Sequence, residues 1–192
     1  MKLYVVRHGE SENNLNKCWT GWMDVNLTEK GYEDAKCAGA IIENVKFDKV
    51  YSSDLKRAVD TAKTALPGYE IEKTSLIREI NVGKCAGKTF AECNEKYEKE
   101  MEISRQTGGY DSLGGESKEE FTYRLKKFMD IVAASGHENV AAFAHGGVLR
   151  NILNIVLQTG LPRGKMLCKN CALAIFEFDG ESWYVDSWIN LQ

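Results

Sequence analysis

The sequence predicts an α/β fold, a three-layer α/β/α sandwich with a mostly parallel central sheet, formed by a single domain over residues 1–192. Short apolar runs typical of buried strands alternate with longer segments in which apolar residues recur every three or four positions. Near the C-terminus, Asp179-Gly180 separates two further apolar stretches, which is typical of a hairpin turn. We therefore expect a largely parallel sheet, covered by helices on both faces and completed by an antiparallel hairpin.

The expected strands and helices alternate in chain order. Apolar runs predict buried strands over residues 3–6, 47–51 and 140–144, and hairpin strands over residues 172–178 and 183–185. Apolar residues at helical spacing predict helices over residues 35–45, 55–66, 121–132 and 149–156. Ser117, followed three residues later by Glu120, is a capping box that begins the third of these helices. The glutamate-rich residues 92–102 predict a further, solvated helix.

The composition narrows the classes of partner. The 192 residues include 25 Lys and Arg against 28 Asp and Glu, a net charge of −3, and contain no basic cluster. Nucleic-acid binders and proteins of anionic membranes normally have such a cluster, so we expect neither partner. No apolar run is long enough to cross a bilayer, no export signal is visible, and the six cysteines suit reduced thiols, so we expect a cytoplasmic protein. The sequence leaves open whether it is a monomer or a homodimer.

Chemically versatile residues follow directly after three of the expected strands. Arg7 and His8 follow the first, a segment with Arg57 follows the second, and His145 follows the third. In open α/β sheets ligands bind beyond the carboxyl ends of the strands, so these residues are expected to meet at one edge. A single histidine there could be a core or capping residue. The matched pair of histidines beside two arginines favours a functional site instead.

Two arginines and two imidazoles at one edge suit a phosphoryl group. Arginine is always charged and its planar fork binds phosphate. Helix starts after Ser53 and after Gly146-Gly147 would add N–H groups toward the same anion. Nearby arginines disfavour imidazolium, so one imidazole stays neutral and can attack phosphorus. The sequence thus predicts phosphoryl transfer through a phosphohistidine, with no metal and no cofactor. Glu79 could supply the proton for the leaving oxygen, since a bound phosphate dianion would favour its protonated form.

An opening signature and five further blocks resemble a known family in order and spacing. They are Arg7-His8-Gly9-Glu10-Ser11-Glu12-Asn13-Asn14; Thr20-Gly21-Trp22 with Asp24 and Leu27-Thr28; Ser52-Ser53-Asp54-Leu55-Lys56-Arg57-Ala58; Glu79 with Gly83 and Gly87; Gly114-Gly115-Glu116-Ser117; and His145-Gly146-Gly147. These blocks resemble the histidine phosphatase superfamily, also called the phosphoglycerate mutase-like family. The resemblance covers nearly the whole chain and implies the phosphoglycerate mutase-like fold and a small phosphate ester as the partner.

The resemblance implies a role for each matching residue. His8 corresponds to the phosphorylated nucleophile, and Glu79 to the proton donor for the leaving group. The residues that correspond to the cradle around the phosphate are Arg7, Arg57 and His145. The matches on the substrate side are Asn14 as a further phosphate contact, Ser11, Thr20 and Gly21 as lining residues, and Gly146 through its backbone N–H.

Two activities of this family remain open for the chain. The block Trp19-Thr20-Gly21-Trp22 is similar to the cofactor-dependent mutases, which implies isomerisation of phosphoglycerate. The mutases, however, carry an insertion with a lysine and an arginine pair that grip a carboxylate and a second phosphate. Here Phe90 stands near the place of that lysine, and no Arg-Arg pair occurs. We therefore expect water to discharge the phosphoenzyme, so that the chain hydrolyses a phosphate monoester. Cys85-Ala86 stands where many hydrolases have a tryptophan and an acidic residue, which leaves the pocket shape open.

Three other patterns favour different functions less well. The segment from Gly83 to Thr89 resembles a nucleotide-triphosphate loop, but has three residues where that loop has four. Cys168 and Cys171 have the spacing of a redox pair or half a zinc site, but no second pair supplies the other zinc ligands. A non-catalytic sensor of phosphate esters would need no acid, so Glu79 favours an enzyme.

Overall fold

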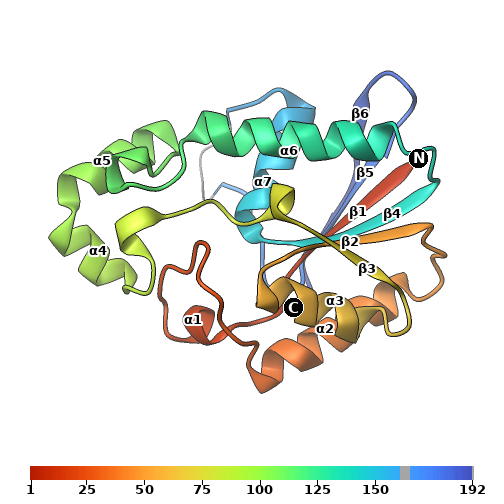
Figure 1. Cartoon of the computed structure of the whole chain (residues 1–192), viewed down its shortest axis with the longest axis horizontal. Coiled ribbons are helices and arrows are strands. Elements are labelled where there is room, and N and C mark those ends of the chain that lie inside the picture. The colour runs from red at the N-terminus through yellow and green to blue at the C-terminus, as the bar shows by residue number, and fades with distance from the viewer. Residues whose placement is uncertain (161–164, 192) are drawn as a thin grey trace.

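A six-stranded sheet forms the middle layer of the computed structural model, which describes residues 1–160 and 165–191 (Figure 1). The strands are β1 (Lys2–Arg7), β2 (Lys49–Ser53), β3 (Ile71–Thr74), β4 (Asn139–Ala144), β5 (Leu173–Phe178) and β6 (Trp183–Ile189). Their order across the sheet is β3-β2-β4-β1-β5-β6. The first four of these run parallel, whereas β5 and β6 form an antiparallel hairpin beside β1. The mostly parallel sheet with a terminal hairpin is thus confirmed.

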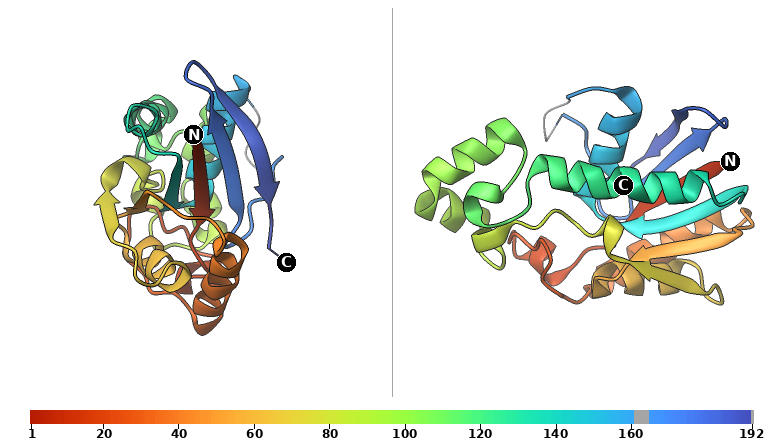
Figure 2. Two further views of the ribbon diagram at one scale, coloured as in Figure 1. Left: turned by 90° about the vertical axis from the view of Figure 1, so that its right-hand side faces the viewer. Right: turned by 45° about the horizontal axis from the view of Figure 1, so that its top comes forward.

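Helices cover both faces of the sheet, as the sequence predicts. The α-helices are α1 (Glu12–Leu15), α2 (Glu29–Ile42), α3 (Lys56–Ala65), α4 (Phe90–Lys96), α5 (Glu98–Thr107), α6 (Lys118–Ala133) and α7 (Gly146–Leu157). Helices α6 and α7 lie on one face and α2 and α3 on the other (Figure 2). Helices α4 and α5 project beyond the end of the sheet. This is the three-layer α/β/α arrangement.

Alternating side chains along the strands build two separate cores. In β1, Leu3 and Val5 belong to the core beneath α6 and α7, whereas Tyr4 and Val6 belong to the core beneath α2 and α3. Successive side chains of a strand point to opposite faces, so burial on both sides explains the unbroken apolar runs of the sequence. With a core on each face, the end of β1 is a rigid base for the residues that follow it.

The carboxyl ends of β1, β2 and β4 meet at one edge of the sheet because these strands are parallel. Arg7 of β1 is paired with Ala144 of β4, and Ser52 of β2 with Phe143 of β4. The backbone N–H of His8 then donates to Ala144 O over 2.9 Å. The register of the sheet therefore brings the residues after β1 and after β4 side by side.

Several boundaries differ from the expected ones. Strand β2 begins later, at Lys49, and runs on through Ser52 and Ser53, because these two serines are fully buried despite their polarity. A helix start directly after Ser53 was expected, but α3 begins at Lys56. The N–H of Lys56 donates to Asp24 Oδ1 over 2.9 Å, so this donor is occupied within the protein. That the start of this helix faces the same anion as the start of α7 stays a prediction, without the Lys56 N–H among its donors.

The region between β2 and α6 contains the elements that the sequence predicts least well. The sequence does not predict strand β3, because three of its four residues are polar and it forms the edge of the sheet. The glutamate-rich segment forms the two helices α4 and α5 rather than one, with a break at Tyr97, whose φ is −130°. Glu79 lies in the loop that follows a 3₁₀ turn, Ser75–Ile77, and not at the end of a strand.

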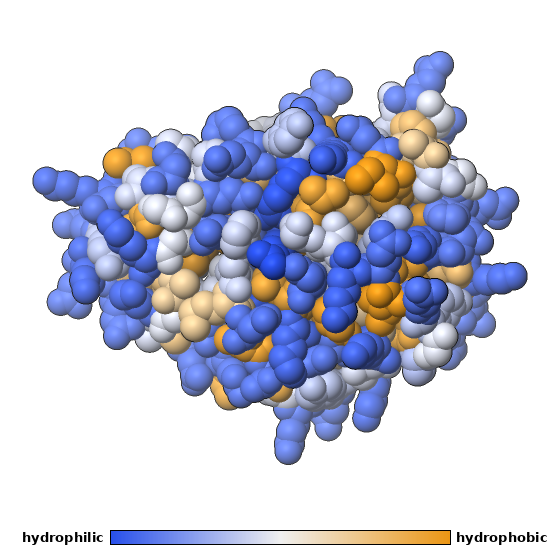
Figure 3. Space-filling model, viewed as in Figure 1, coloured by the Kyte–Doolittle hydropathy of each residue, from blue (hydrophilic) through white to orange (hydrophobic). Residues whose placement is uncertain are grey.

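The face of the molecule drawn in Figure 3 is mainly polar. Figure 3 shows hydrophilic side chains over most of one face, interrupted by apolar groups between α6 and α3, where Figure 1 places β3 and the turn after it. No helix among residues 1–160 and 165–191 is both long and apolar enough to cross a membrane.

Candidate active site

His8 follows β1 directly, and two hydrogen bonds fix its ring. Nδ1 lies 2.7 Å from the carbonyl oxygen of Gly9, and because a carbonyl only accepts, Nδ1 carries the hydrogen. Nε2 then has the lone pair, and Arg57 Nε donates to it over 3.3 Å. The side chain is buried, with 4% exposure. His8 therefore presents Nε2 as its nucleophilic atom.

The surroundings of His8 keep its imidazole neutral. Burial, together with the guanidinium groups of Arg57 and Arg7, holds the pKa of His8 well below its usual range. Burial also lowers the pKa of Arg57 to about 10, so this arginine still carries its charge at neutral pH. Its terminal nitrogens donate to the carbonyl oxygens of Met23 and Gly21, each over 2.8 Å. Arg57 thus connects the loop that contains Gly21 and Met23 to the nucleophile His8.

His145 follows β4 and is the N-cap residue of α7, and its ring lies beside that of His8. The ring centroids are 5.2 Å apart and the planes are inclined by 61°. Nε2 lies 2.9 Å from Ser53 Oγ, whereas Nδ1 is buried and has no hydrogen-bond partner among the described residues. Burial, and then the charge of Arg57, hold the pKa of His145 well below its usual range. This second imidazole is therefore neutral as well.

Arg7, the last residue of β1, is the second guanidinium of the site. Its Nη1 donates to the carbonyl oxygen of Cys168, while Nε is buried and lacks a hydrogen-bond partner in the described part of the chain. Burial lowers the pKa of this arginine. A buried donor without a partner costs about 1 to 3 kcal/mol. An anionic oxygen placed at Nε would remove this cost, so the site favours an anion.

The carboxylate of Glu79 is held between two backbone N–H groups. Oε1 accepts from Ile80 over 2.9 Å, and Oε2 accepts from Gly147 over 3.0 Å. Gly147 lies in the first turn of α7, the helix that His145 caps. This hydrogen bond therefore holds the carboxylate of Glu79 close to the second histidine. A Cβ at Gly147 would lie 2.1 Å from Glu79 Oε1, so the contact requires glycine at this position.

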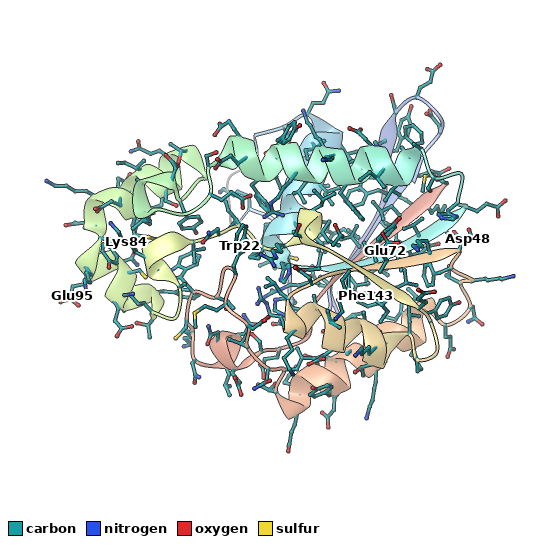
Figure 4. All side chains as sticks on the ribbon, in the orientation of Figure 1. Trp22, Asp48, Glu72, Lys84, Glu95 and Phe143 are labelled. Carbon is teal, nitrogen blue, oxygen red and sulfur yellow. The ribbon has the colours of Figure 1, made fainter. Side chains whose placement is uncertain are left out.

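The backbone of Glu79 is held as firmly as its side chain. Its carbonyl oxygen accepts from Trp22 Nε1 over 2.7 Å and from Arg124 Nη2 over 2.9 Å. Figure 4 shows Trp22 near the centre of the molecule, where the N-terminal loop meets the segment that carries Glu79. Arg124 of α6 also binds two further carbonyls of this segment and forms a bidentate ion pair with Glu116. These contacts place the acid independently of the sheet.

A cavity of about 620 Å³ opens from these residues. The expected catalytic residues that line it are Arg7, His8, Arg57 and Glu79. His145 lies behind this wall, against the ring of His8. Aromatic side chains that line the cavity are Trp19, Phe90, Tyr110 and Phe121. Cavities of this size enclose small-molecule ligands, so there is room for an alcohol moiety besides a phosphoryl group.

The residues expected on the substrate side are only partly at the cavity. Asn14, Thr20 and Gly21 line it. Ser11 is fully buried and caps α1, and its hydroxyl accepts from the N–H of Asn14 over 3.4 Å. Gly146 is buried too, and the glycine after it forms the wall at this point. The structure thus gathers Asn14, Thr20 and Gly21 at the cavity and places Ser11 and Gly146 behind its surface.

Asn170 is a residue of the site that sequence reasoning missed. Its side-chain amide donates to His8 O over 3.1 Å and to Asn14 Oδ1 over 3.0 Å. The N–H of Cys171 also donates to His8 O, over 3.3 Å. These bonds fix the backbone of the nucleophile from the segment before β5. The only signal in the sequence is a polar residue before an antiparallel strand, a position that no rule connects with ligand binding.

Cys168 and Cys171 contribute their backbones rather than their thiols. Burial raises the pKa of Cys168 and raises that of Cys171 to about 12, so both thiols are protonated at neutral pH. Neither is in a disulfide. Within the described ranges, no group of three or more His, Cys, Asp or Glu side chains is arranged to hold a metal ion.

Known proteins are similar to this chain in sequence and in fold. Among curated relatives, the 2,3-bisphosphoglycerate-dependent phosphoglycerate mutase of Streptococcus thermophilus is 37% identical over 170 residues, which cover 84% of this chain and 70% of that protein. The enzyme of the same name from Cytophaga hutchinsonii is 34% identical over 182 residues, covering 84% and 85%. Among solved structures, Bacillus stearothermophilus YhfR superimposes with a TM-score of 0.89 at 27% identity, covering 96% of this chain and 94% of that one.

A family model described as the histidine phosphatase superfamily, branch 1, matches residues 3–191. Because this match spans nearly the whole chain, the protein belongs to the histidine phosphatase superfamily, as its motifs predict.

Proposed function

We propose that the protein hydrolyses a small phosphate monoester through a phosphohistidine formed on His8. The tautomer of His8 carries the proposal: Nδ1–H is bound to Gly9 O, which leaves Nε2 as a nucleophile among cations. A neutral imidazole attacks phosphorus, while the guanidinium groups of Arg7 and Arg57 offset the charge of the phosphate. Arg7 Nε, which lacks a partner among the described residues, offers a further hydrogen bond to one of its oxygens.

The reaction has two steps, each an in-line displacement at phosphorus. In the first, His8 Nε2 bonds to phosphorus while the bond to the ester oxygen breaks, and the bond from Nδ1–H to Gly9 O stabilises the positive imidazole. Glu79 gives its proton to the departing oxygen, so a neutral alcohol leaves. In the second step water attacks phosphorus and gives a proton to Glu79 as the N–P bond breaks. Inorganic phosphate leaves and His8 is neutral again.

A phosphoglycerate mutase is the second candidate, favoured by the relatives of that name. A mutase returns the phosphoryl group to a hydroxy acid and must keep water from the phosphoenzyme. Two features of this chain favour hydrolysis. No Arg-Arg pair occurs in the sequence, and Phe90, which stands near the place of the mutase lysine, lines the cavity.

Phosphate release from a panel of monoesters, measured with and without a chelator, tests the proposal. We expect turnover that persists with the chelator, is lost in His8→Ala, and yields an acid-labile phosphorylated His8 when it is trapped. Efficient interconversion of 2- and 3-phosphoglycerate only after priming with the bisphosphate would favour the mutase. Turnover that never produces a phosphorylated protein would overturn both.

A further inference from the structure

A tight turn directly before β5 packs against the active site. The N–H of Ala172 donates to Lys169 O over 3.0 Å and closes this turn. Its two central residues are Asn170 and Cys171. Cys171 has a φ of +55°, a left-handed conformation that residues other than glycine seldom adopt. Such a conformation persists where the surrounding contacts leave the backbone no alternative, so the turn is held firmly in place.

The turn binds the nucleophile through both its backbone and a side chain. The carbonyl oxygen of His8 accepts from the N–H of Cys171 over 3.3 Å and from Asn170 Nδ2 over 3.1 Å. Just before the turn, Cys168 O accepts from Arg7 Nη1. The contacts of the two cysteines come from the backbone, and the contact of Asn170 comes from its side chain. Asn170 is therefore the residue of this segment whose contribution a substitution can test.

The side-chain amide of Asn170 has one possible orientation. A carbonyl oxygen only accepts hydrogen bonds, so the atom that lies 3.1 Å from His8 O carries hydrogens and is Nδ2. The other hydrogen of this NH₂ group is available to Asn14 Oδ1, which lies 3.0 Å from Nδ2. One hydrogen thus holds Asn170 against the backbone of the nucleophile, and the other holds Asn14.

The amide of Asn14 is fixed by the same reasoning. The N–H of Ser11 only donates, so the atom of Asn14 that lies 3.2 Å from it is the oxygen Oδ1. This oxygen accepts a second hydrogen bond, from Asn170. Ser11 is fully buried, so a rotated Asn14 amide would leave the Ser11 N–H without an acceptor. Asn14 Oδ1 is therefore occupied within the protein and is not free for a ligand.

The polar atom that remains on the Asn14 side chain is the donor Nδ2. Asn14 lines the cavity together with the nucleophile and both arginines, and none of the described residues accepts a hydrogen bond from its Nδ2. The oxygens of a phosphate dianion only accept, so they bind an N–H group and repel an amide oxygen. The orientation that Ser11 and Asn170 impose on Asn14 is therefore the one that suits a phosphoryl group.

We propose that Asn170 is a positioning residue for the phosphate, which holds the amide of Asn14 so that Nδ2 is presented to a phosphoryl oxygen. The proposal rests on the proposed phosphatase function, which places the phosphate beside His8. Asn170 is not among the residues that line the cavity, so it acts through Asn14 and not on the ligand. The turn before β5 thereby connects the nucleophile with a contact to the phosphate, from a position 156 residues after Asn14.

Binding of inorganic phosphate, the expected product, tests the proposal without turnover. Asn170→Leu keeps roughly the shape of the side chain and removes both donated hydrogen bonds, whereas His8 O keeps the bond from the N–H of Cys171. The loss of one neutral hydrogen bond changes an equilibrium by roughly 3- to 10-fold. We therefore expect the Kd of phosphate, measured by calorimetry, to rise about 3- to 10-fold in this variant.

A double-mutant cycle shows whether Asn170 acts through Asn14. In Asn14→Ala protein there is no amide to orient, so Asn170→Leu should change the Kd of phosphate less than about twofold in that background. A factor that is the same in both backgrounds would mean that Asn170 supports the fold in general, and would overturn the proposal. If Asn170→Leu does not fold, Asn170→Ala replaces it in the same cycle, with the same criterion.

Asn190→Leu is the matched control. Asn190 follows β6 directly and holds the same segment, because its Oδ1 accepts from the N–H of Lys169 over 2.9 Å and its Nδ2 donates to Leu167 O over 3.2 Å. Neither of these bonds reaches Asn14. We expect this variant to lower the melting temperature, as Asn170→Leu does, and to leave the Kd of phosphate unchanged. An equal rise of the Kd in both variants would overturn the positioning role.

The outcomes separate this proposal from the phosphatase function on which it rests. An unchanged Kd in Asn170→Leu overturns the positioning role, and so does a failure of the unmodified protein to bind phosphate. Trapping of phosphorylated His8 decides the phosphatase in either case, because the trap reports the covalent step and not the affinity for phosphate.

Discussion

Replacing Arg124 by lysine should weaken the positioning of Glu79 without touching a residue that lines the cavity. The guanidinium makes five hydrogen bonds, two with the carboxylate of Glu116 and one each with the carbonyl oxygens of Leu76, Arg78 and Glu79. A lysine keeps the charge but lacks the planar fork, so it can retain only part of this set. At about 1 kcal/mol for a neutral acceptor and 1.5 to 3 for a charged one, we expect Arg124→Lys to lower the free energy of unfolding by about 2 to 4 kcal/mol.

The activity of this variant depends on the leaving group. A general acid accelerates the departure of a poor leaving group by roughly 10²- to 10⁴-fold, and a phenol that leaves as an anion needs little of this help. If Arg124 acts through Glu79, Arg124→Lys lowers turnover of an alkyl phosphate about 10- to 100-fold and that of p-nitrophenyl phosphate less than about threefold. The assay compares kcat for the two esters at a temperature where the variant is fully folded.

A variant of similar chemistry controls for general damage. Arg78 forms a bidentate ion pair with Asp54, with contacts of 2.7 and 2.6 Å, and lies over the Trp22 ring at 5.0 Å from its centroid. A lysine keeps a cation over that ring, so the contact of Trp22 with Glu79 is retained while the bidentate pair is lost. Arg78→Lys should therefore lower stability while the ratio of the two activities stays unchanged. Equal losses for both esters in Arg124→Lys, or the same change of ratio in Arg78→Lys, would refute the positioning role.

Three further changes probe the same site. Glu79→Gln should lower turnover of alkyl phosphates by roughly 10²- to 10⁴-fold and that of p-nitrophenyl phosphate far less, and equal losses would contradict its role as acid. Gly147→Ala, whose Cβ would lie 2.1 Å from Glu79 Oε1, should lower alkyl-ester turnover about tenfold. Gly136→Ala, at a φ of +73° in the loop before β4 and away from the cavity lining, controls for lost stability and should leave turnover of the folded protein unchanged. Burial lowers the pKa of His8 and His145 in the folded protein, so below their ordinary value of 6.5 the unfolded chain binds more protons. The melting temperature should therefore fall as the pH drops below 6.5, and these two groups should add no pH dependence above pH 6.5. In His145→Gln the melting temperature should fall less steeply with pH. The same steepness in this variant as in the unmodified protein would contradict a neutral, buried His145.

Local patterns in the sequence predicted which candidate site residues follow directly after strands. His8 and His145 follow strands that are apolar throughout, and parallel strands must end at the same edge, so their meeting follows from topology alone. The polarity of Ser52 and Ser53 hid the end of β2, and with it the place where α3 begins. Burial decides the conformation of these serines, and burial is a tertiary property that the local pattern does not contain.

The residues that hold the acid could not be predicted in the same way. Arg124 of α6 acts through its bonds to the carbonyl oxygens of the loop that carries Glu79, and these bonds depend on how the helix packs against that loop. Its only sequence signal is a polar side chain in an otherwise apolar helical pattern. In α7, Arg150 is such a residue, a cation in the run Gly146–Leu157. A search for positioning residues could therefore start with the helices next to a predicted site at strand ends. The candidates are polar residues on the otherwise apolar, buried face of those helices.

The nucleophile and the phosphate cradle arise from the same electrostatic arrangement. Burial lowers the pKa of His8, Arg7 and Arg57, because the charged form of each is destabilised away from water. For the imidazole the result is a neutral nucleophile. For the arginines, which stay charged, it is an unfavourable loss of hydration that a bound phosphate dianion offsets. A neutral residue in place of Arg57 would therefore remove one of the two guanidinium groups of the cradle and at the same time raise the pKa of His8. The two functions cannot be separated by a single substitution there.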